Sequence, residues 1–170
     1  MRWLTLPALL AVMLSAAGCQ AADSPDTPLA PKGVTPGRRL PWPEETKAVA
    51  DWSFAAGQQE IAIETRGAKG RSSVTVWCVV VGEKLYVATD SRSRKRWVTQ
   101  IERDPSARVG IAGRTYPVRA RRVQKPEEWD AVMAAYARKY AGQIANYDFP
   151  KPGNTASGRV FELVSAPGAS

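Results

Sequence analysis

The chain has 170 residues, of which 44% are hydrophobic, so it can form the core of one domain with little room for a second. It contains no histidine, which excludes Ser-His-Asp and Cys-His nucleophile systems, the usual zinc catalytic sites and histidine-ligated haem. The 24 Lys and Arg residues against 16 Asp and Glu residues give a net charge of +8. Two cysteines allow at most one disulfide.

Residues 1–18 predict a targeting segment. Arg2 supplies a positive charge, and the apolar stretch 4–17 that follows is too short to span a bilayer comfortably. Small residues then precede Cys19, and this pattern resembles the lipobox of bacterial lipoproteins, although Ala16 stands where the lipobox prefers leucine. The alternative is an ordinary secretory signal that happens to contain a cysteine.

The lipobox resemblance implies that Cys19 becomes the lipidated N-terminus of the mature protein. Gln20, rather than an aspartate, then implies delivery to the outer membrane of the cell envelope, facing the periplasm. Two or three acyl chains would anchor the protein far more firmly than one. Cys78 would remain as a lone thiol, and it lies in a β-branched run, so we expect a buried structural residue.

Residues 19–45 are rich in proline and poor in apolar side chains. Such a segment cannot bury enough surface to offset its ordering entropy, so it predicts an extended tether. The folded domain is then expected to cover residues 46–170.

The pattern predicts a mainly β domain that opens with a short helix and contains two further helices, a short inserted one and a longer one. The short turns at Gly82 and Gly113 favour antiparallel hairpins, and closure into a small barrel would remove exposed sheet edges. One apolar stripe marks the longer helix: Trp129, Val132, Met133, Tyr136 and Tyr140. The predicted helices cover residues 44–52, 97–103 and 126–140, and the predicted strands cover 59–65, 73–81, 84–89, 107–112, 115–123 and 159–164.

Several short motifs follow one another between residues 67 and 140. They are a basic glycine loop, a strand with Trp77, a Gly-x-Leu-Tyr-Val hairpin, a helix from Trp97 to Asp104-Pro105, and a Gly-Arg-Thr-Tyr-Pro-Val turn. In this order they resemble the flavin-binding split β-barrel superfamily, above all deazaflavin-dependent nitroreductases and their small relatives. The resemblance implies a six-stranded antiparallel barrel with a short inserted helix and FMN or deazaflavin as cofactor.

The resemblance also implies two phosphate-binding stretches that converge at one rim of the barrel. The segment before Trp97 is two residues longer than in the related pattern, which leaves the individual ligands open. Arginine forks, serine hydroxyls and loop amides suit a phosphate chemically. Trp77 or Trp97 would flank the cofactor ring or pack inside the barrel. The implied cofactor-binding residues are Lys69, Arg71, Ser72, Ser73, Ser93, Arg94 and Lys95.

The basic segment 92–96 has two other readings, a solvated surface loop and a contact with anionic lipid headgroups. Because export would take the protein to an envelope that offers little nucleic acid, we expect no nucleic-acid partner. No metal site is predicted, and a homodimer is left open. No residue can be identified from the sequence as a catalytic acid or base. We therefore expect a membrane-anchored envelope lipoprotein with a noncatalytic binding or interaction role. The alternative is an FMN- or deazaflavin-dependent oxidoreductase.

Overall fold

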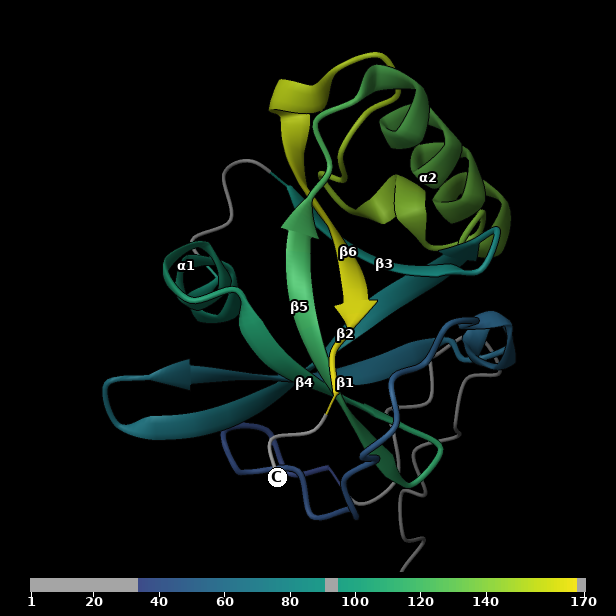
Figure 1. Ribbon diagram of the computed structural model, residues 1–170. Coiled ribbons are helices and arrows are strands. Elements are labelled where there is room, and N and C mark those ends of the chain that lie inside the picture. The colour runs from purple at the N-terminus through teal and green to yellow at the C-terminus, as the bar shows by residue number, and fades with distance from the viewer. Residues whose placement is uncertain (1–33, 91–94, 168–170) are drawn as a thin grey trace, which may run out of the picture.

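The computed structural model describes residues 34–90 and 95–167 (Figure 1). Six antiparallel strands close into a barrel in the order β1-β2-β3-β6-β5-β4, as the split-barrel resemblance implies. The predicted signal segment, Cys19, Ser93 and Arg94 lie outside the described residues. The elements are η1 (Ser53–Ala55), β1 (Glu60–Gly67), β2 (Gly70–Val81), β3 (Lys84–Asp90), α1 (Arg96–Arg103), β4 (Ser106–Ile111), β5 (Arg114–Arg122), α2 (Pro126–Lys139), η2 (Ile144–Asn146), η3 (Thr155–Ser157) and β6 (Gly158–Ser165).

Alternation along the strands sends apolar side chains to two separate cores. In β2, Cys78 belongs to the core inside the barrel, whereas the next residue, Val79, belongs to a core on the outer face. Trp97, Val98 and Ile101 of α1 join the inner core. The outer core lies beneath α2, which packs against β2.

The predicted helix stripe is confirmed. Its five members are buried, with Trp129, Val132, Tyr136 and Tyr140 completely inaccessible and Met133 at 2% exposure. Glu127 and Glu128 in the first turn, together with Arg138 and Lys139 in the last, complement the helix dipole. None of the helices in the described ranges is long and apolar enough to cross a membrane.

Residues 34–52, which we call the strap, lie along the barrel. The Gly37 amide donates to Ser73 O over 2.8 Å, the Ser73 amide donates to Arg38 O over 2.9 Å, and Leu40 is buried. The predicted tether is therefore too long at its C-terminal end, since residues 34–45 dock on the domain. A proline-rich segment can still form backbone hydrogen bonds and bury an apolar side chain when it lies against a strand edge.

The helix predicted over residues 44–52 is wrong. Glu44 instead forms a parallel bridge with Thr115, and the first helical turn is η1. The strap also explains why a glycine occupies position 110. A Cβ there would come within 2.4 Å of the Trp42 ring. This stretch follows tertiary contacts with β4 and β5 in place of its local helical pattern.

A buried carboxylate fixes the strap to the barrel. Glu64 in β1 is inaccessible to solvent, and it accepts hydrogen bonds from the Leu40 amide at 2.6 Å and from Arg108 Nε at 2.8 Å. Arg108 also reaches Glu44 of the strap at 2.7 Å. Because a charge-assisted bond is roughly twice as strong as a neutral one, this network clamps the strap against β1 and β4.

Candidate binding site in the split of the barrel

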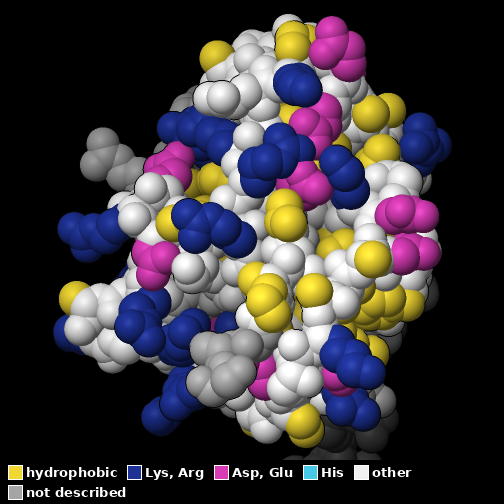
Figure 2. All heavy atoms as spheres, viewed as in Figure 1, with side chains coloured by type: hydrophobic (Ala, Val, Ile, Leu, Met, Phe, Trp, Pro, Cys, Tyr) yellow, Lys and Arg dark blue, Asp and Glu magenta, His cyan; other side chains and the backbone are white. Residues whose placement is uncertain are grey.

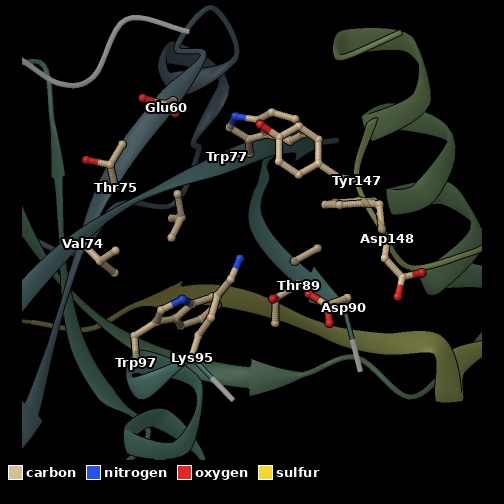
Figure 3. Close-up of a pocket in the computed structure, with 13 residues that line it drawn as sticks. Glu60, Val74, Thr75, Trp77, Thr89, Asp90, Lys95, Trp97, Tyr147 and Asp148 are labelled. Atoms are coloured by element: carbon tan, nitrogen blue, oxygen red, sulfur yellow. The ribbon is translucent and has the colours of Figure 1, made fainter. Parts of the chain in front are cut away.

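Strands β2 and β3 separate partway along their length. They pair only where Cys78–Val81 faces Lys84–Val87. Beyond that point β2 pairs with β1 as far as Gly70, and β3 pairs with β6 as far as Asp90. The facing edges of β2 and β3 therefore lose their mutual hydrogen bonds, and a gap opens between them (Figure 3).

This β2–β3 gap holds a hollow of about 260 Å³. One wall comes from β1 and β2, the opposite wall from β3 and the start of α1, and the loop after α2 closes one side. The lining residues are Glu60, Val74, Thr75, Val76, Trp77, Ala88, Thr89, Asp90, Lys95, Trp97, Tyr147, Asp148 and Phe149.

Aromatic rings form the β2 side of the gap. Trp77 stacks on Tyr140 with 4.5 Å between ring centroids, and Tyr147 meets it edge-on at 5.0 Å. Tyr147 is 61% exposed, so its ring stands at the mouth of the gap. Figure 3 shows Trp77 and Tyr147 facing Trp97, Lys95 and Thr89 across the hollow. The β2 side thus offers aromatic contacts to a ring-shaped ligand.

Two buried polar atoms at the gap lack a hydrogen-bond partner. Of the buried side-chain nitrogen and oxygen atoms in the described part of the chain, only Thr89 Oγ1 and Trp97 Nε1 are unsatisfied. Both residues line the gap, and they are 2% and 5% exposed. An unpaired buried polar group costs about 1–3 kcal/mol. Their coincidence at one hollow indicates a place where a ligand supplies the missing partners.

The charged groups of the lining are mainly acidic. Lys95 is the cationic side chain among the described lining residues, whereas Glu60, Asp90 and Asp148 are carboxylates. Burial raises the pKa of Glu60, and a hydrogen bond from Trp77 partly opposes that rise. Glu60 and Trp77 face each other across β1 and β2. Burial at the aromatic side of the gap thus disfavours the charged form of Glu60.

The predicted phosphate residues lie at different places. Lys95 lines the gap, at the N-cap of α1. Ser73 Oγ donates to Arg38 O at 2.7 Å, which places it under the strap, and Ser72 faces Thr65 across β1 and β2. Lys69 is exposed in the turn between β1 and β2.

Arg71 lies away from Lys95. Its guanidinium is 3.7 Å from Glu64 and also acts on Asp104, which follows the C-terminal end of α1. Lys95 precedes the other end of this eight-residue helix. At 1.5 Å per residue the helix is about 12 Å long, so Arg71 and Lys95 are associated with opposite ends of α1. Convergence of the two stretches on one phosphate stays a prediction, because Ser93 and Arg94 lie outside the described residues.

The sequence reasoning identified Trp77 and Trp97 as candidates to flank a ring, and both line the gap. It missed Thr89, Glu60 and Tyr147. Alternation could have singled out Thr89, a polar residue at an inward position after Leu85 and Val87. Nothing local marks Tyr147, because its place depends on how the loop after α2 returns to the barrel.

The Cys78 thiol is buried and free, as expected for a structural residue. Burial raises its pKa to about 11. The Cys78 carbonyl accepts hydrogen bonds from Lys139 Nζ at 2.9 Å and from the Tyr140 hydroxyl at 2.8 Å, so these polar groups tie α2 to β2. A neutral, enclosed thiol is a poor nucleophile.

Comparison with solved structures finds the same fold. The heme storage protein HutZ from Vibrio cholerae is 17% identical, with a TM-score of 0.51 over 68% of this chain and 87% of that one. A conserved hypothetical protein from Mycobacterium tuberculosis is 16% identical, with a TM-score of 0.50 over 72% and 84%. A structure described as an F420 reductase is also 16% identical, with a TM-score of 0.46 over 69% and 94%. At these identities the likeness establishes the fold alone.

Comparison with curated proteins finds no match. One protein family matches residues 54–156, which run from η1 through the last 3-10 turn before β6 and so include every residue that lines the β2–β3 gap. The chain therefore belongs to the family described as uncharacterized protein conserved in bacteria (DUF2255).

Proposed function

We propose that the β2–β3 gap binds a flat, ring-shaped cofactor of the flavin type, FMN or a deazaflavin. The observation that carries this proposal is the pair of unsatisfied polar atoms, Thr89 Oγ1 and Trp97 Nε1, at one hollow. The split-barrel fold shared with other proteins is consistent with it, but fold alone does not assign a function.

The residues of the gap fit the ring of such a cofactor. An indole N–H only donates, so Trp97 requires an acceptor, and a threonine hydroxyl both donates and accepts. The carbonyl and nitrogen groups along the edge of a flavin ring provide both kinds of partner. Trp77 and Tyr147 line the hollow and provide aromatic contacts for the ring, and the volume of about 260 Å³ suits a ring system without its full side chain.

The phosphate of FMN does not fit deep in the gap, because the carboxylate of Asp90 would repel it there. We place it at the mouth near Lys95. Ser93 and Arg94, which precede Lys95 in the sequence, remain phosphate ligands expected from the sequence alone. A bound flavin would supply hydride or electron transfer, while Trp77, Thr89 and Trp97 would hold the ring in position.

Titration of the chain from residue 19 onward, with Cys19→Ser, tests the proposal. Absorbance and fluorescence are followed during addition of FMN, a deazaflavin and riboflavin. Micromolar binding of one of these is expected, and Trp97→Phe should weaken it about 10-fold through loss of one hydrogen bond. Trp42→Phe serves as a matched control, since Trp42 belongs to the strap, packs on Gly110 and is not among the residues that line the gap. Absence of binding by all three compounds would end the proposal.

A second variant separates the ring from the phosphate. Arg94→Ala should weaken FMN binding about 10- to 100-fold if Arg94 contacts the phosphate, and it should leave riboflavin binding unchanged. Equal FMN affinity in wild type and variant would remove Arg94 from the site while leaving the ring assignment intact. Reduction of a bound flavin by nicotinamide donors would then distinguish an oxidoreductase from a noncatalytic binding protein.

We also propose that the domain is held at the cell envelope through lipidation of Cys19. The support is the lipobox-like sequence before Cys19 and a predicted tether that leads to the strap. Mass spectrometry of the membrane fraction should show a mature protein that begins at an acylated Cys19. An intact Met1, or an unmodified cysteine, would exclude the anchor.

A further inference from the structure

The basic side chains around the β1–β2 turn form a surface outside the proposed ring site. Arg66 and Arg71 face each other across the two strands, and Lys69 lies in the turn between them. Arg38 of the strap lies beside β2, because its carbonyl oxygen accepts a hydrogen bond from the Ser73 amide at 2.9 Å. We call these four residues the basic hairpin face.

This hairpin extends beyond the body of the barrel (Figure 1). Figure 2 shows Lys and Arg side chains gathered over the hairpin and the strap, on the side away from α2. Arg38, Arg66 and Lys69 are exposed. A projecting hairpin with exposed cations can contact a flat surface that the rest of the barrel would not reach.

The charges of this face are only partly balanced within the domain. Like charges directly opposite each other on neighbouring strands destabilise a sheet, and Arg66 faces Arg71 in this way. Two carboxylates lie nearby. Glu64 is buried and already engaged by Arg108, while Asp104 accepts from the Ser106 amide at 3.0 Å. An external layer of negative charge would relieve the repulsion between the arginines.

The path of the chain indicates where that layer lies. The strap enters the described structure at Val34, four residues before Arg38, and Cys19 precedes Val34 by 15 residues. Fully extended, such a segment spans at most about 50 Å. If Cys19 is lipidated, as proposed above, the basic hairpin face stays within a short tether of the membrane surface at high effective concentration.

We propose that the basic hairpin face binds anionic phospholipid headgroups, so that the tethered domain lies on the membrane in one preferred orientation. The strap determines this orientation, because Glu64 and Arg108 of the barrel hold Leu40 and Glu44 of the strap in place. The mouth of the β2–β3 gap lies elsewhere on the barrel, at Tyr147 and Lys95, and stays open to solvent in this arrangement.

The test uses the chain from residue 19 onward with Cys19→Ser, so that no acyl chain contributes. Cosedimentation is measured with vesicles of phosphatidylcholine alone and with vesicles containing phosphatidylglycerol. Binding is expected only to the anionic vesicles and should weaken as salt increases. Because each basic residue contributes about 5-fold, the triple variant Arg38→Gln, Arg66→Gln, Lys69→Gln should lower the partition coefficient roughly 100-fold.

A control variant removes the same charge from the α2 side of the molecule. Lys125, Arg138 and Lys151 are exposed there, and their triple change to Gln should lower partitioning less than about 5-fold. Equal losses in both triple variants would show that net charge alone drives binding and would overturn the proposal. So would binding of heparin in place of vesicles, or no vesicle binding at all.

Two further measurements separate this proposal from the earlier ones. Thermal unfolding confirms that both triple variants fold, and flavin titration should give the same affinity in each. The vesicle assay involves neither flavin nor acyl chain. Its result can therefore be interpreted even if ring binding fails or Cys19 is not acylated in cells.

Discussion

The indole ring of Trp77 lies flat on the phenol ring of Tyr140, with 4.5 Å between the centroids and 6° between the planes. The Tyr140 hydroxyl accepts a hydrogen bond from the Cys78 amide at 3.1 Å and shares its one proton between Gln59 O at 2.5 Å and Cys78 O at 2.8 Å. The end of α2 thus holds the aromatic wall of the β2–β3 gap in place. A site on β2 consequently depends on a residue that follows α2 in the sequence.

Tyr140→Phe should keep the ring stack and remove these hydrogen bonds. The buried Cys78 amide would then lose its partner, so the free energy of unfolding should fall by about 1–3 kcal/mol. Urea unfolding measures this loss. Tyr147→Phe is the control, since Tyr147 is largely exposed and its change should alter stability by less than about 0.5 kcal/mol. Equal effects of the two changes would contradict the role given to the Tyr140 hydroxyl.

Thr89→Val should stabilise the unliganded protein by about 1 kcal/mol while weakening ring binding. It removes an unsatisfied buried hydroxyl and keeps the shape of the side chain. Thr115→Val should destabilise the protein, because the Thr115 hydroxyl, which is also buried, donates to Trp42 O at 3.2 Å. Thermal unfolding of both variants checks the two signs. A loss of stability in Thr89→Val would show that its hydroxyl is satisfied within the protein.

Arg108→Ala should release the strap from the barrel. The change leaves the buried Glu64 with the Leu40 amide and the more distant Arg71 guanidinium at 3.7 Å, and breaking a buried pair costs up to about 3–5 kcal/mol. Limited proteolysis should then cleave within residues 34–45 much faster than in wild type. Glu44→Gln alters the more exposed partner of Arg108 and should cost less than about 1 kcal/mol. A strap that stays protected in Arg108→Ala would show that Leu40 and Trp42 hold it by packing alone.

Trp129→Ala should lower the free energy of unfolding by about 3–5 kcal/mol, since the ring is fully buried between α2 and the barrel. It also removes the hydrogen bond from Nε1 to Lys151 O at 2.9 Å. Trp129→Phe retains most of the packing and should lose less. Chemical unfolding gives the comparison, and an unchanged midpoint for the alanine variant would place α2 outside the cooperative core.

Cys78 should make stability fall at high pH. Its folded pKa of about 11 lies above the ordinary value of 9.0, so folding favours the neutral thiol. This contribution is fully present below pH 9 and is lost as the pH rises to 11. It amounts to about 2–3 kcal/mol at 1.36 kcal/mol per pH unit. In Cys78→Ala the extra pH dependence should disappear, as measured by urea unfolding between pH 8 and pH 11 with Cys19→Ser in both proteins. Identical pH profiles would show that the thiol does not titrate differently on folding.

Local patterns in the sequence determined the barrel strands and both helices. The alternation in β2, the turn at Gly82, where φ is +61°, and the stripe from Trp129 to Tyr140 act over a few residues, so each is readable without knowledge of its partners. The order of motifs between residues 67 and 140 then indicated the split barrel. The same local rules failed at residues 34–52, where partners from β1, β4 and β5 override a sequence with helical or tether-like character.

Only the tertiary structure decided the site. The gap exists because β2 and β3 stop pairing after Cys78 and Val87, and no residue in either strand signals that separation. Arg71 and Lys95 both have the chemistry to bind phosphate, yet they are associated with opposite ends of α1, and only the path of that helix shows it. Thr89 and Trp97 are identified as site residues because Thr89 Oγ1 and Trp97 Nε1 have no hydrogen-bond partner. A missing partner is a property of the packed chain, because every polar group in an unfolded chain is satisfied by water.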